Sequence, residues 1–453
     1  MNKKFYFDLS TTKTIMLSFF LAALTGSILL SLPVSSASGK AVPYIDALFT
    51  ATTSICVTGL VTVPTVSTWS IWGQAVILVL IQIGGLGVIT IISGLMIGLH
   101  RKIGIGDRML IQDAFNLNTL SGLVEFIKKV FVGTFVVEGI GALLYMTVFV
   151  PEYGTKGIWI SVFNSISAFC NAGMDVISED SLCGYALNPM INIVTGILII
   201  LGGIGYIVWW DVIRVLKNIK GQGLKCFLSM TLHSKIALST TGFLIVTGAA
   251  VFFIFEYNNP LTIMDYSFID KLQASLFQSI TTRTAGFAAI PQQNLTNASS
   301  IVSLLLMFIG GSPSGTAGGV KTVTASVLIV SALATIKSKE EAVLFNRSIS
   351  KQAVNKAVAV VSISFITMFI STLLLSAATN ANVLDIVYET VSATATVGLS
   401  RNLTSKLNIW GKIIIIITMY LGRVGPISLF IAFNTQKGSS NIIKNPTEEI
   451  SIG

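Results

Sequence analysis

Long apolar runs alternate along the chain with shorter apolar runs that end in stretches rich in glycine and hydroxyl residues. The first long run, Thr14 to Leu32, approaches the roughly 20 residues that a helix needs to cross a bilayer, and no signal-peptide cleavage site follows it cleanly. The next run is too short to cross and ends in TSICVTGL, Thr53 to Leu60. This order predicts a spanning helix followed by a half-helix that stops inside the membrane and turns back.

The same order of a long run, a short run and a second long run occurs four times. Aligned on one glycine, the short runs carry, at a nearly constant spacing, Gly59, Gly173, Gly286 and Gly398. A large residue stands ten positions earlier in each copy, namely Phe49, Phe163, Leu276 and Tyr388. A second glycine motif follows in each copy: QIGGLG (82–87), ILGGIG (200–205), FIGGSPSG (308–315) and YLGRVG (420–425). Two motifs in register indicate four copies of one structural unit.

Each unit is expected to form a spanning helix, a re-entrant half-helix and a second spanning helix. The first helices are expected at 14–34, 128–150, 234–256 and 356–378. The half-helices are expected at 43–55, 158–169, 270–282 and 383–395, and the second helices at 72–98, 190–213, 299–336 and 409–434. The sequence therefore predicts an all-α polytopic membrane protein with eight full spans, built from four repeats (1–98, 99–225, 226–336 and 337–453) around a pseudo-fourfold pore.

Composition agrees with this architecture and excludes a soluble protein. Of the 453 residues, 53% are hydrophobic and 11% are charged, against about 25% charged residues in soluble domains. Lys and Arg gather at the termini and in alternate loops, so the net charge of +9 reflects topology and does not indicate nucleic-acid binding. By the positive-inside rule, the termini and the basic loops are cytoplasmic. The acidic loops would then face outside and concentrate cations at an outer mouth.

The four returning loops are the candidate cation-binding site. Non-helical backbone at membrane depth is tolerated only where it is buried in protein or lines a water-filled cavity. Carbonyl oxygens from four such loops could replace the hydration shell of a monovalent cation, and glycine readily adopts the positive φ that turns a carbonyl toward the axis. One such loop would be an ordinary extracellular turn, whereas four in register favour a selectivity filter. Its residues would be Cys56, Val57, Thr58, Gly59, Cys170, Asn171, Ala172, Gly173, Arg283, Thr284, Ala285, Gly286, Ala395, Thr396, Val397 and Gly398.

The second helix of the third copy carries a dense group of helix breakers that the other copies lack. Gly and Pro cost about 1 and about 3 kcal/mol in a helix interior, so this segment favours a flexible intramembrane loop that could act as a gate. A glycine-packed kink is the alternative. The gate residues would be Gly310, Gly311, Ser312, Pro313, Ser314, Gly315, Thr316, Ala317, Gly318 and Gly319. Lys321, just beyond them, is expected to extend toward the membrane surface.

Two charged residues fall inside apolar runs. Arg423 stands where the other copies have Gly85, Gly203 and Gly311. A guanidinium at mid-membrane costs about 2.5–3.5 kcal/mol even on lenient scales and indicates a function. Arg423 could oppose cation passage electrostatically below the filter or anchor loop carbonyls by hydrogen bonding, and the sequence leaves both roles open. Glu138 is a second intramembrane charge, to which the sequence assigns no specific role.

The four filter loops, the GGSPSGTAGG segment and the arginine of YLGRVG resemble the Trk/Ktr/HKT superfamily of cation transporters across essentially the whole chain. With no extra helices before the first repeat, the chain is most similar to the KtrB-type membrane subunits of bacterial Ktr systems. The resemblance implies potassium uptake across the bacterial plasma membrane, often stimulated by sodium, through a pore in each protomer of a homodimer. It assigns the filter glycines to Gly59, Gly173, Gly286 and Gly398, the gate loop to Gly310 through Gly319, and the pore arginine to Arg423.

The resemblance also implies a partner, a cytosolic ring of KtrA-type subunits whose RCK domains bind ATP and ADP. This chain has no nucleotide-binding signature such as GxGxxG after a strand, so no nucleotide is expected to bind to it. Sodium-selective plant relatives carry Ser at the first filter glycine, and Gly59 therefore favours potassium. Membrane lipids would surround the protein.

Other classes of function fit less well. No GxSxG or HExxH motif or paired intramembrane Asp occurs, and the two histidines lie at the edges of apolar runs, so an enzyme is not expected. The four cysteines lack CxxC spacing, and no metal site is expected beyond the monovalent cations of the filter. The repeats run in the same orientation, which suits a pore better than an inverted-repeat transporter. The remaining alternative is a sodium-selective or sodium-coupled cation transporter of the same architecture.

Overall fold

The computed structural model describes residues 11–99, 122–218, 223 and 228–425. Its helices and strands are α1 (Thr11–Ser31), α2 (Tyr44–Ile55), α3 (Thr65–Thr68), α4 (Ile71–Leu86), α5 (Val88–Gly98), α7 (Leu123–Tyr153), α8 (Lys156–Cys170), α9 (Pro189–Ile204), α10 (Tyr206–Lys217), α12 (Leu232–Glu256), α13 (Phe268–Thr281), α14 (Asn297–Phe308), α15 (Thr322–Ile336), β1 (Val343–Leu344), β2 (Arg347–Ser348), α16 (Lys351–Ala378), α17 (Val383–Ala395) and α18 (Ile409–Val424). The two strands form a short antiparallel hairpin between α15 and α16.

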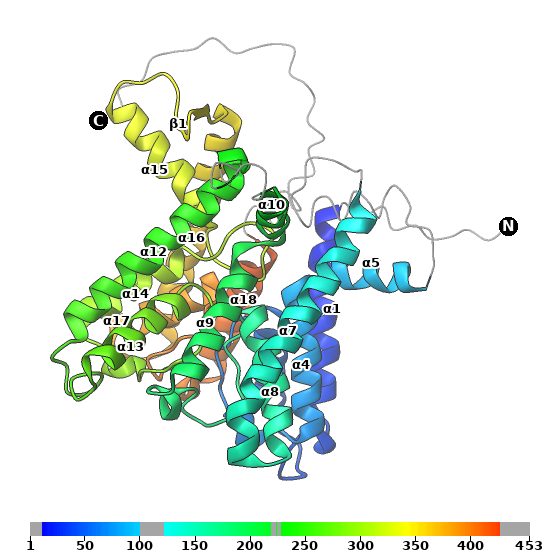
Figure 1. Cartoon of the computed structure of the whole chain (residues 1–453). Helices are drawn as coiled ribbons and strands as arrows, with labels where there is room; N and C mark the ends of the chain where they lie inside the picture. The colour runs from blue at the N-terminus through cyan, green and yellow to red at the C-terminus, as the bar shows by residue number, and fades with distance from the viewer. Residues whose placement is uncertain (1–10, 100–121, 219–222, 224–227, 426–453) are drawn as a thin grey trace.

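The long first helices and the half-helices lie close to the predicted positions. The first helices are α1, α7, α12 and α16, and the half-helices are α2, α8, α13 and α17. Each half-helix packs against the long helix before it, as Figure 1 shows for α7 and α8. The half-helices form the centre of the protein, because their C-terminal halves and the loops that follow are buried, as residues 49–60 illustrate.

The second helices differ from the prediction, which expected a break in the third copy alone. In the first copy, α4 ends at Gly87 and α5 leaves at 95°, across the direction of α4 in Figure 1. In the second copy, α9 ends at Gly205 and α10 leaves at 99°. These two glycines have φ of 86° and 93°, which an α-helix cannot accommodate. The last glycine of each motif is therefore a helix terminator, and the expectation of continuous helices at 72–98 and 190–213 was wrong.

Four of the described helices are long and apolar enough to cross a membrane, and six spans result if each bent pair counts as one. The second helix of the third copy is split into the shorter apolar helices α14 and α15, as its glycines and proline predicted. In the fourth copy, α18 stops before Gly425, whose φ is 91°. The two termini (1–10 and 426–453) and the basic loop at 100–121 lie outside the described residues.

The third half-helix is one residue out of register with the alignment. Phe49, Phe163 and Tyr388 are fully buried, but Leu276 is 42% exposed, and the neighbouring Phe277 is 2% exposed. The prediction that Leu276 matches the other three was therefore wrong. The reason is that the loop after α13 is anchored one residue closer to its glycine, which rotates the helix relative to the other copies.

Candidate cation pathway

The four aligned glycines form a closed ring. Their φ values are 96° at Gly59, 64° at Gly173, 83° at Gly286 and 98° at Gly398. A Cβ added to each would collide with the backbone oxygen of the residue before the next glycine in the ring, in the order Ala172, Ala285, Val397 and Thr58. Each loop therefore abuts the next, and the fourth returns to the first. Only glycine fits these positions, because both the φ angle and the space exclude a side chain.

The backbone alternates its handedness on the way to each glycine. The residue two positions earlier also has a positive φ in every loop: 55° at Val57, 59° at Asn171, 65° at Thr284 and 51° at Thr396. For β-branched residues this conformation is a genuine outlier, held only where the surroundings over-determine it, as at functional sites. Alternation of left- and right-handed residues turns successive carbonyl groups to the same side. No glycine marks these positions, so the sequence analysis did not identify them.

Hydroxyl residues at the ends of the half-helices hold the loops. The amides of Thr58, Ala172 and Val397 donate to backbone oxygens six positions before their glycines, each at 2.8 Å. In the first copy, Thr53 Oγ1 also accepts from Gly59 N at 3.0 Å. In the third copy, Ala285 N instead donates to the nearer Thr281 O at 3.0 Å, the one-residue difference noted above. The recurrence of Thr53, Ser167 and Ser392 is a sequence signal that could have identified this support.

The loop amides therefore donate hydrogen bonds within the protein, whereas the loop carbonyls face the ring. Among the described residues, no backbone amide of a loop or turn donates to the backbone oxygens of Thr58, Ala172, Ala285 and Val397. A buried carbonyl without a partner is unfavourable. An arrangement of this kind can offer its oxygens to a dehydrated cation.

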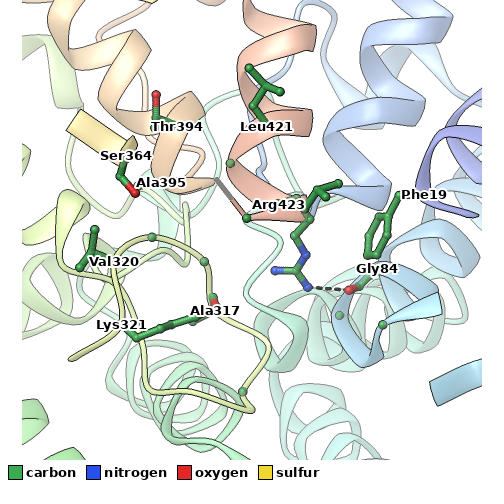
Figure 2. A pocket seen from close by; sticks show the side chains of 18 of the residues that line it. Phe19, Gly84, Ala317, Val320, Lys321, Ser364, Thr394, Ala395, Leu421 and Arg423 are labelled. Atoms are coloured by element: carbon green, nitrogen blue, oxygen red, sulfur yellow. Dashed lines mark hydrogen bonds between the residues drawn. The ribbon is translucent and has the colours of Figure 1, made fainter. Parts of the chain in front are cut away.

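The ring lies between two cavities. One cavity, of about 490 Å³, touches all four glycines and is also lined by Asp175, Glu179 and Asp180. It is named the outer cavity, and the other the inner cavity, after the orientation that the charge distribution predicts. The inner cavity, of about 360 Å³, is lined by the gate segment, the QIGGLG motif and Arg423 (Figure 2). Acidic side chains at the outer cavity agree with the predicted acidic mouth, and together the cavities and the ring outline a path through the protein.

The predicted gate segment, Gly310 through Gly319, is a non-helical loop between α14 and α15. Its base is closed by backbone hydrogen bonds from Gly310 N to Val320 O at 2.9 Å and from Val320 N to Phe308 O at 3.0 Å. The loop also binds the end of α9, where Ser312 N donates to Gly203 O at 2.8 Å. The loop thus satisfies carbonyls that the end of α9 leaves without helical partners.

The gate loop also lies directly against three of the candidate filter loops. Thr316 Oγ1 donates to Phe169 O at 3.0 Å in the second copy. Gly318 N donates to Thr284 Oγ1 at 3.1 Å in the third. A Cβ at Gly318 would lie 2.6 Å from Ala395 O in the fourth. The loop therefore packs closely against the second, third and fourth copies beside the ring.

Arg423, at the end of α18, links the gate loop to the first copy. Its Nη1 donates to Thr316 O at 2.7 Å, and its Nη2 donates to Gly84 O at 2.5 Å. Figure 2 shows the guanidinium reaching from α18 toward Gly84 across the inner cavity. These contacts are those of an anchor, and because Arg423 also lines the cavity, it places positive charge there as well.

Comparison with known proteins assigns the family. The family model "TrkH: Cation transport protein" matches residues 2–444. The chain belongs to the TrkH family of cation transport proteins. It is 39% identical to "Ktr system potassium uptake protein B" of Bacillus subtilis, over 97% of this chain and 96% of that protein. It is 37% identical to "Potassium/sodium uptake protein NtpJ" of Enterococcus hirae, over 100% of this chain and 99% of that protein.

A solved structure supports the same assignment at the level of the fold. The potassium transporter TrkH from Vibrio parahaemolyticus matches with a TM-score of 0.76 and 16% identity, over 96% of this chain and 87% of that one. The family model and the curated relatives confirm the resemblance found in the sequence. As a member of the TrkH family, the protein is a multi-pass membrane protein of a transporter family rather than an enzyme family, and a bacterial plasma membrane fits this assignment.

Three charged side chains of this TrkH-family protein lie where the sequence did not place them. Lys321 donates from Nζ to Ala317 O at 2.5 Å and lines the inner cavity, so the expectation that it extends to the membrane surface was wrong (Figure 2). Glu138 accepts from Gln82 Nε2 at 3.1 Å and from the Cys170 thiol at 3.9 Å, behind the second filter loop.

The third is Arg283, which the sequence assigned to the filter through its backbone. Its side chain points away from the ring and is 7% exposed. Its Nη2 donates to Thr241 Oγ1 on α12 at 3.3 Å and to Gly310 O at the base of the gate loop at 3.2 Å. Spacing in the sequence could not reveal this contact, because it depends on how the third half-helix is rotated.

Proposed function

We propose that this protein takes up potassium across the bacterial plasma membrane through a pore whose selectivity filter is the ring of four loops. The observation that carries the proposal is the closed ring of positive-φ glycines. The carbonyl of the residue before each glycine lies against its neighbour in the ring, and a cavity lies on each side of the ring. Carbonyl dipoles can replace the water of a dehydrated cation. The filter residues are Cys56, Val57, Thr58, Gly59, Cys170, Asn171, Ala172, Gly173, Arg283, Thr284, Ala285, Gly286, Ala395, Thr396, Val397 and Gly398, and the transported ion is their only ligand.

The pore is surrounded by four repeats with eight spans and cytoplasmic termini. The order of long helix, half-helix and second helix in each quarter of the described chain supports this count if the broken pairs α4/α5, α9/α10 and α14/α15 each belong to one repeat. The domain boundaries are 1–98, 99–225, 226–336 and 337–453. The distribution of Lys and Arg along the sequence supports the orientation.

The loop from Gly310 to Gly319 is the gate, and Arg423 is the group that holds it closed. The contacts of the loop with three filter loops and the bond from Arg423 to Thr316 O support this role. A gate of this kind opens when its middle leaves the inner cavity. Five of its ten residues are glycine, so few side chains have to leave their contacts when it moves.

Potassium is the favoured ion, and a sodium-selective or sodium-coupled transporter is the second candidate. The Bacillus subtilis relative is named for potassium uptake, whereas the Enterococcus hirae relative is named for potassium and sodium uptake. Glycine at position 59, which lies in the ring, favours potassium by the family resemblance. We also propose that sodium stimulates uptake.

The protein acts as a homodimer with a regulatory partner. The word "system" in the names of its relatives supports a further subunit. We propose a cytosolic ring of KtrA-type subunits whose RCK domains bind ATP and ADP, while this chain binds no nucleotide. Nucleotide exchange on the ring would then shift the gate loop between its two states.

Rubidium uptake into proteoliposomes tests the proposal. Purified protein is compared with Gly59→Ser, whose Cβ would collide with Ala172 O, and with the matched control Gly139→Ser, where nothing lies within 4 Å. We expect potassium to block uptake more strongly than sodium or lithium, Gly59→Ser to weaken that preference, and Gly139→Ser to keep it. If sodium inhibits rubidium uptake as strongly as potassium does, the result favours the second candidate, a sodium-selective or sodium-coupled transporter. Absence of flux with the partner present refutes a pore.

A further inference from the structure

Two consecutive residues of the third filter loop hold two different parts of the gate loop. Arg283 Nη2 donates to Gly310 O, at the base of the gate loop, at 3.2 Å. Thr284 Oγ1 accepts from Gly318 N, near the far end of the loop, at 3.1 Å. Thr284 is also one of the strained filter residues, with a φ of 65°. The side chains of one dipeptide therefore connect the filter to the gate.

The base of the gate loop is a small closed structure that can stay in place while the middle moves. Three backbone hydrogen bonds close it, from Gly310 N to Val320 O, from Val320 N to Phe308 O and from Thr322 N to Gly311 O, at 2.9 to 3.0 Å. A hydroxyl contact of 2.8 Å between Ser312 and Thr322 reinforces it. Beyond the base, the middle of the loop depends on separate bonds, including the one from Arg423 to Thr316 O.

Arg283 has an environment that a purely structural residue would not need. It is 7% exposed, and none of the ion pairs among the described residues includes it. Its Nε has no hydrogen-bond partner in the described part of the chain. A charge inside the membrane is expensive and, by default, functional. Nη2 contacts α12 and the gate loop at once, and the rigid guanidinium fixes the direction of both contacts, whereas the ammonium of a lysine rotates freely.

We propose that Arg283 is a positioning residue that ties the base of the gate loop to the third filter loop, so that filter geometry is preserved while the middle of the loop opens. The proposal rests on the gate and filter of the proposed function. It adds that two arginines have different roles. Arg423 holds the moving part of the loop, whereas Arg283 holds the fixed part. Loss of Arg423 should therefore release flux, and loss of Arg283 should reduce selectivity.

The test compares Arg283→Met, which keeps an unbranched apolar stem and removes the guanidinium, with Arg283→Lys and with the control Thr241→Val. The control removes the other acceptor of the same nitrogen, Thr241 Oγ1, and leaves the bond to Gly310 O. Hydrogen–deuterium exchange of the purified full-length protein reports the base amides of Gly310 and Val320 without any need for transport. Competition of sodium against rubidium uptake reports selectivity.

We expect Arg283→Met to exchange these amides about tenfold faster, in keeping with the loss of a hydrogen bond from a charged group. We expect sodium to become a severalfold better competitor, Arg283→Lys to lie between Arg283→Met and the wild type, and Thr241→Val to behave as the wild type. Unchanged exchange or unchanged competition in folded Arg283→Met overturns the proposal, and so does an equal effect of Thr241→Val. If Arg283→Met does not fold, Arg283→Lys decides by the same criteria.

The exchange measurement separates this inference from the proposed function. If the wild type carries no cation, the transport proposal fails, yet faster exchange in Arg283→Met still establishes the tether. If the wild type is selective for potassium and exchange in Arg283→Met is unchanged, the tether fails and the transport proposal stands.

Discussion

Replacement of Arg423 by methionine is the most direct test of the gate, because it removes the bond that joins the moving loop to the first and fourth copies. Arg423 donates to Thr316 O at 2.7 Å and to Gly84 O at 2.5 Å, and only the first of these bonds holds the gate loop. A hydrogen bond from a charged donor contributes about 1.5–3 kcal/mol. Loss of that amount from the closed state alone shifts the ratio of open to closed gates roughly 10- to 150-fold.

Rubidium uptake into proteoliposomes without the regulatory partner measures this shift, because the unstimulated rate follows the open fraction while that fraction is small. We expect Arg423→Met to raise the unstimulated rate at least about tenfold. Arg423→Lys separates the two roles that the sequence left open. A lysine keeps the positive charge but cannot reach both carbonyls, so an anchor role predicts partial opening and a purely electrostatic barrier predicts none.

The reasoning fails if Arg423→Met is folded and dimeric, binds rubidium, and transports at the unstimulated rate of the wild type. Retained closure would mean that the bonds from Ser312 N to Gly203 O and from Thr316 N to Gly202 O are sufficient to hold the loop. Arg401→Met is a matched control, because Arg401 lies in the loop between α17 and α18 and its contacts are to Asp385, Gln292 and Ser300.

Three further predictions follow from other contacts. Gly318→Ala places a Cβ 2.6 Å from Ala395 O, so the gate loop cannot pack in its closed position and unstimulated rubidium uptake should rise. A rate equal to that of the wild type would contradict the close approach. Glu138→Leu leaves Gln82 Nε2 without its acceptor and should lower stability by about 1–3 kcal/mol, whereas Glu138→Gln should recover much of the loss. Thermal unfolding in detergent measures both, and equal losses would mean that packing alone matters. Arg401→Met breaks a 2.7 Å ion pair with Asp385 and should lower stability by about 1.5–3 kcal/mol without altering ion competition. Altered selectivity would show that the loop between α17 and α18 shapes the filter.

Gly184→Ala is the control for the alanine substitution at Gly318, because nothing lies within 4 Å of a Cβ at Gly184. It should leave the unstimulated rate unchanged. A rise equal to that of Gly318→Ala would indicate that any glycine-to-alanine change in the loops disturbs the protein.

Much of the fold could be predicted because its signals are short-range. The length of an apolar run decides whether a helix can cross the bilayer, and the half-helices α2, α8, α13 and α17 lie close to the predicted positions for that reason. The breakers between Gly310 and Gly319 predicted the break between α14 and α15 from helix propensity alone. The recurrence of Gly59, Gly173, Gly286 and Gly398 likewise identified the ring positions, since a positive φ favours glycine whatever surrounds it.

The breaks at Gly87 and Gly205 were missed because a lone glycine in an apolar run is as compatible with close helix packing as with termination. At Gly205, a contact far away in the sequence distinguishes the two. Pro313 O lies where a Cβ of Gly205 would be, and Tyr206 N donates to Ser314 O at 3.1 Å. The gate loop of the third copy therefore helps to end the second helix of the second copy.

The sequence by itself thus determined the class of protein, the order of its long helices and half-helices and the glycines of the ring, because hydropathy and backbone conformation act over a few residues. The tertiary structure alone decided how the units are joined. It rotated the third half-helix so that Phe277 replaces Leu276 in the core, turned Arg283 out of the ring toward Gly310, and brought Arg423 to Thr316 O. These pairings join segments tens to more than one hundred residues apart. They follow from packing and from the need of each buried polar group for a partner, which no local pattern records.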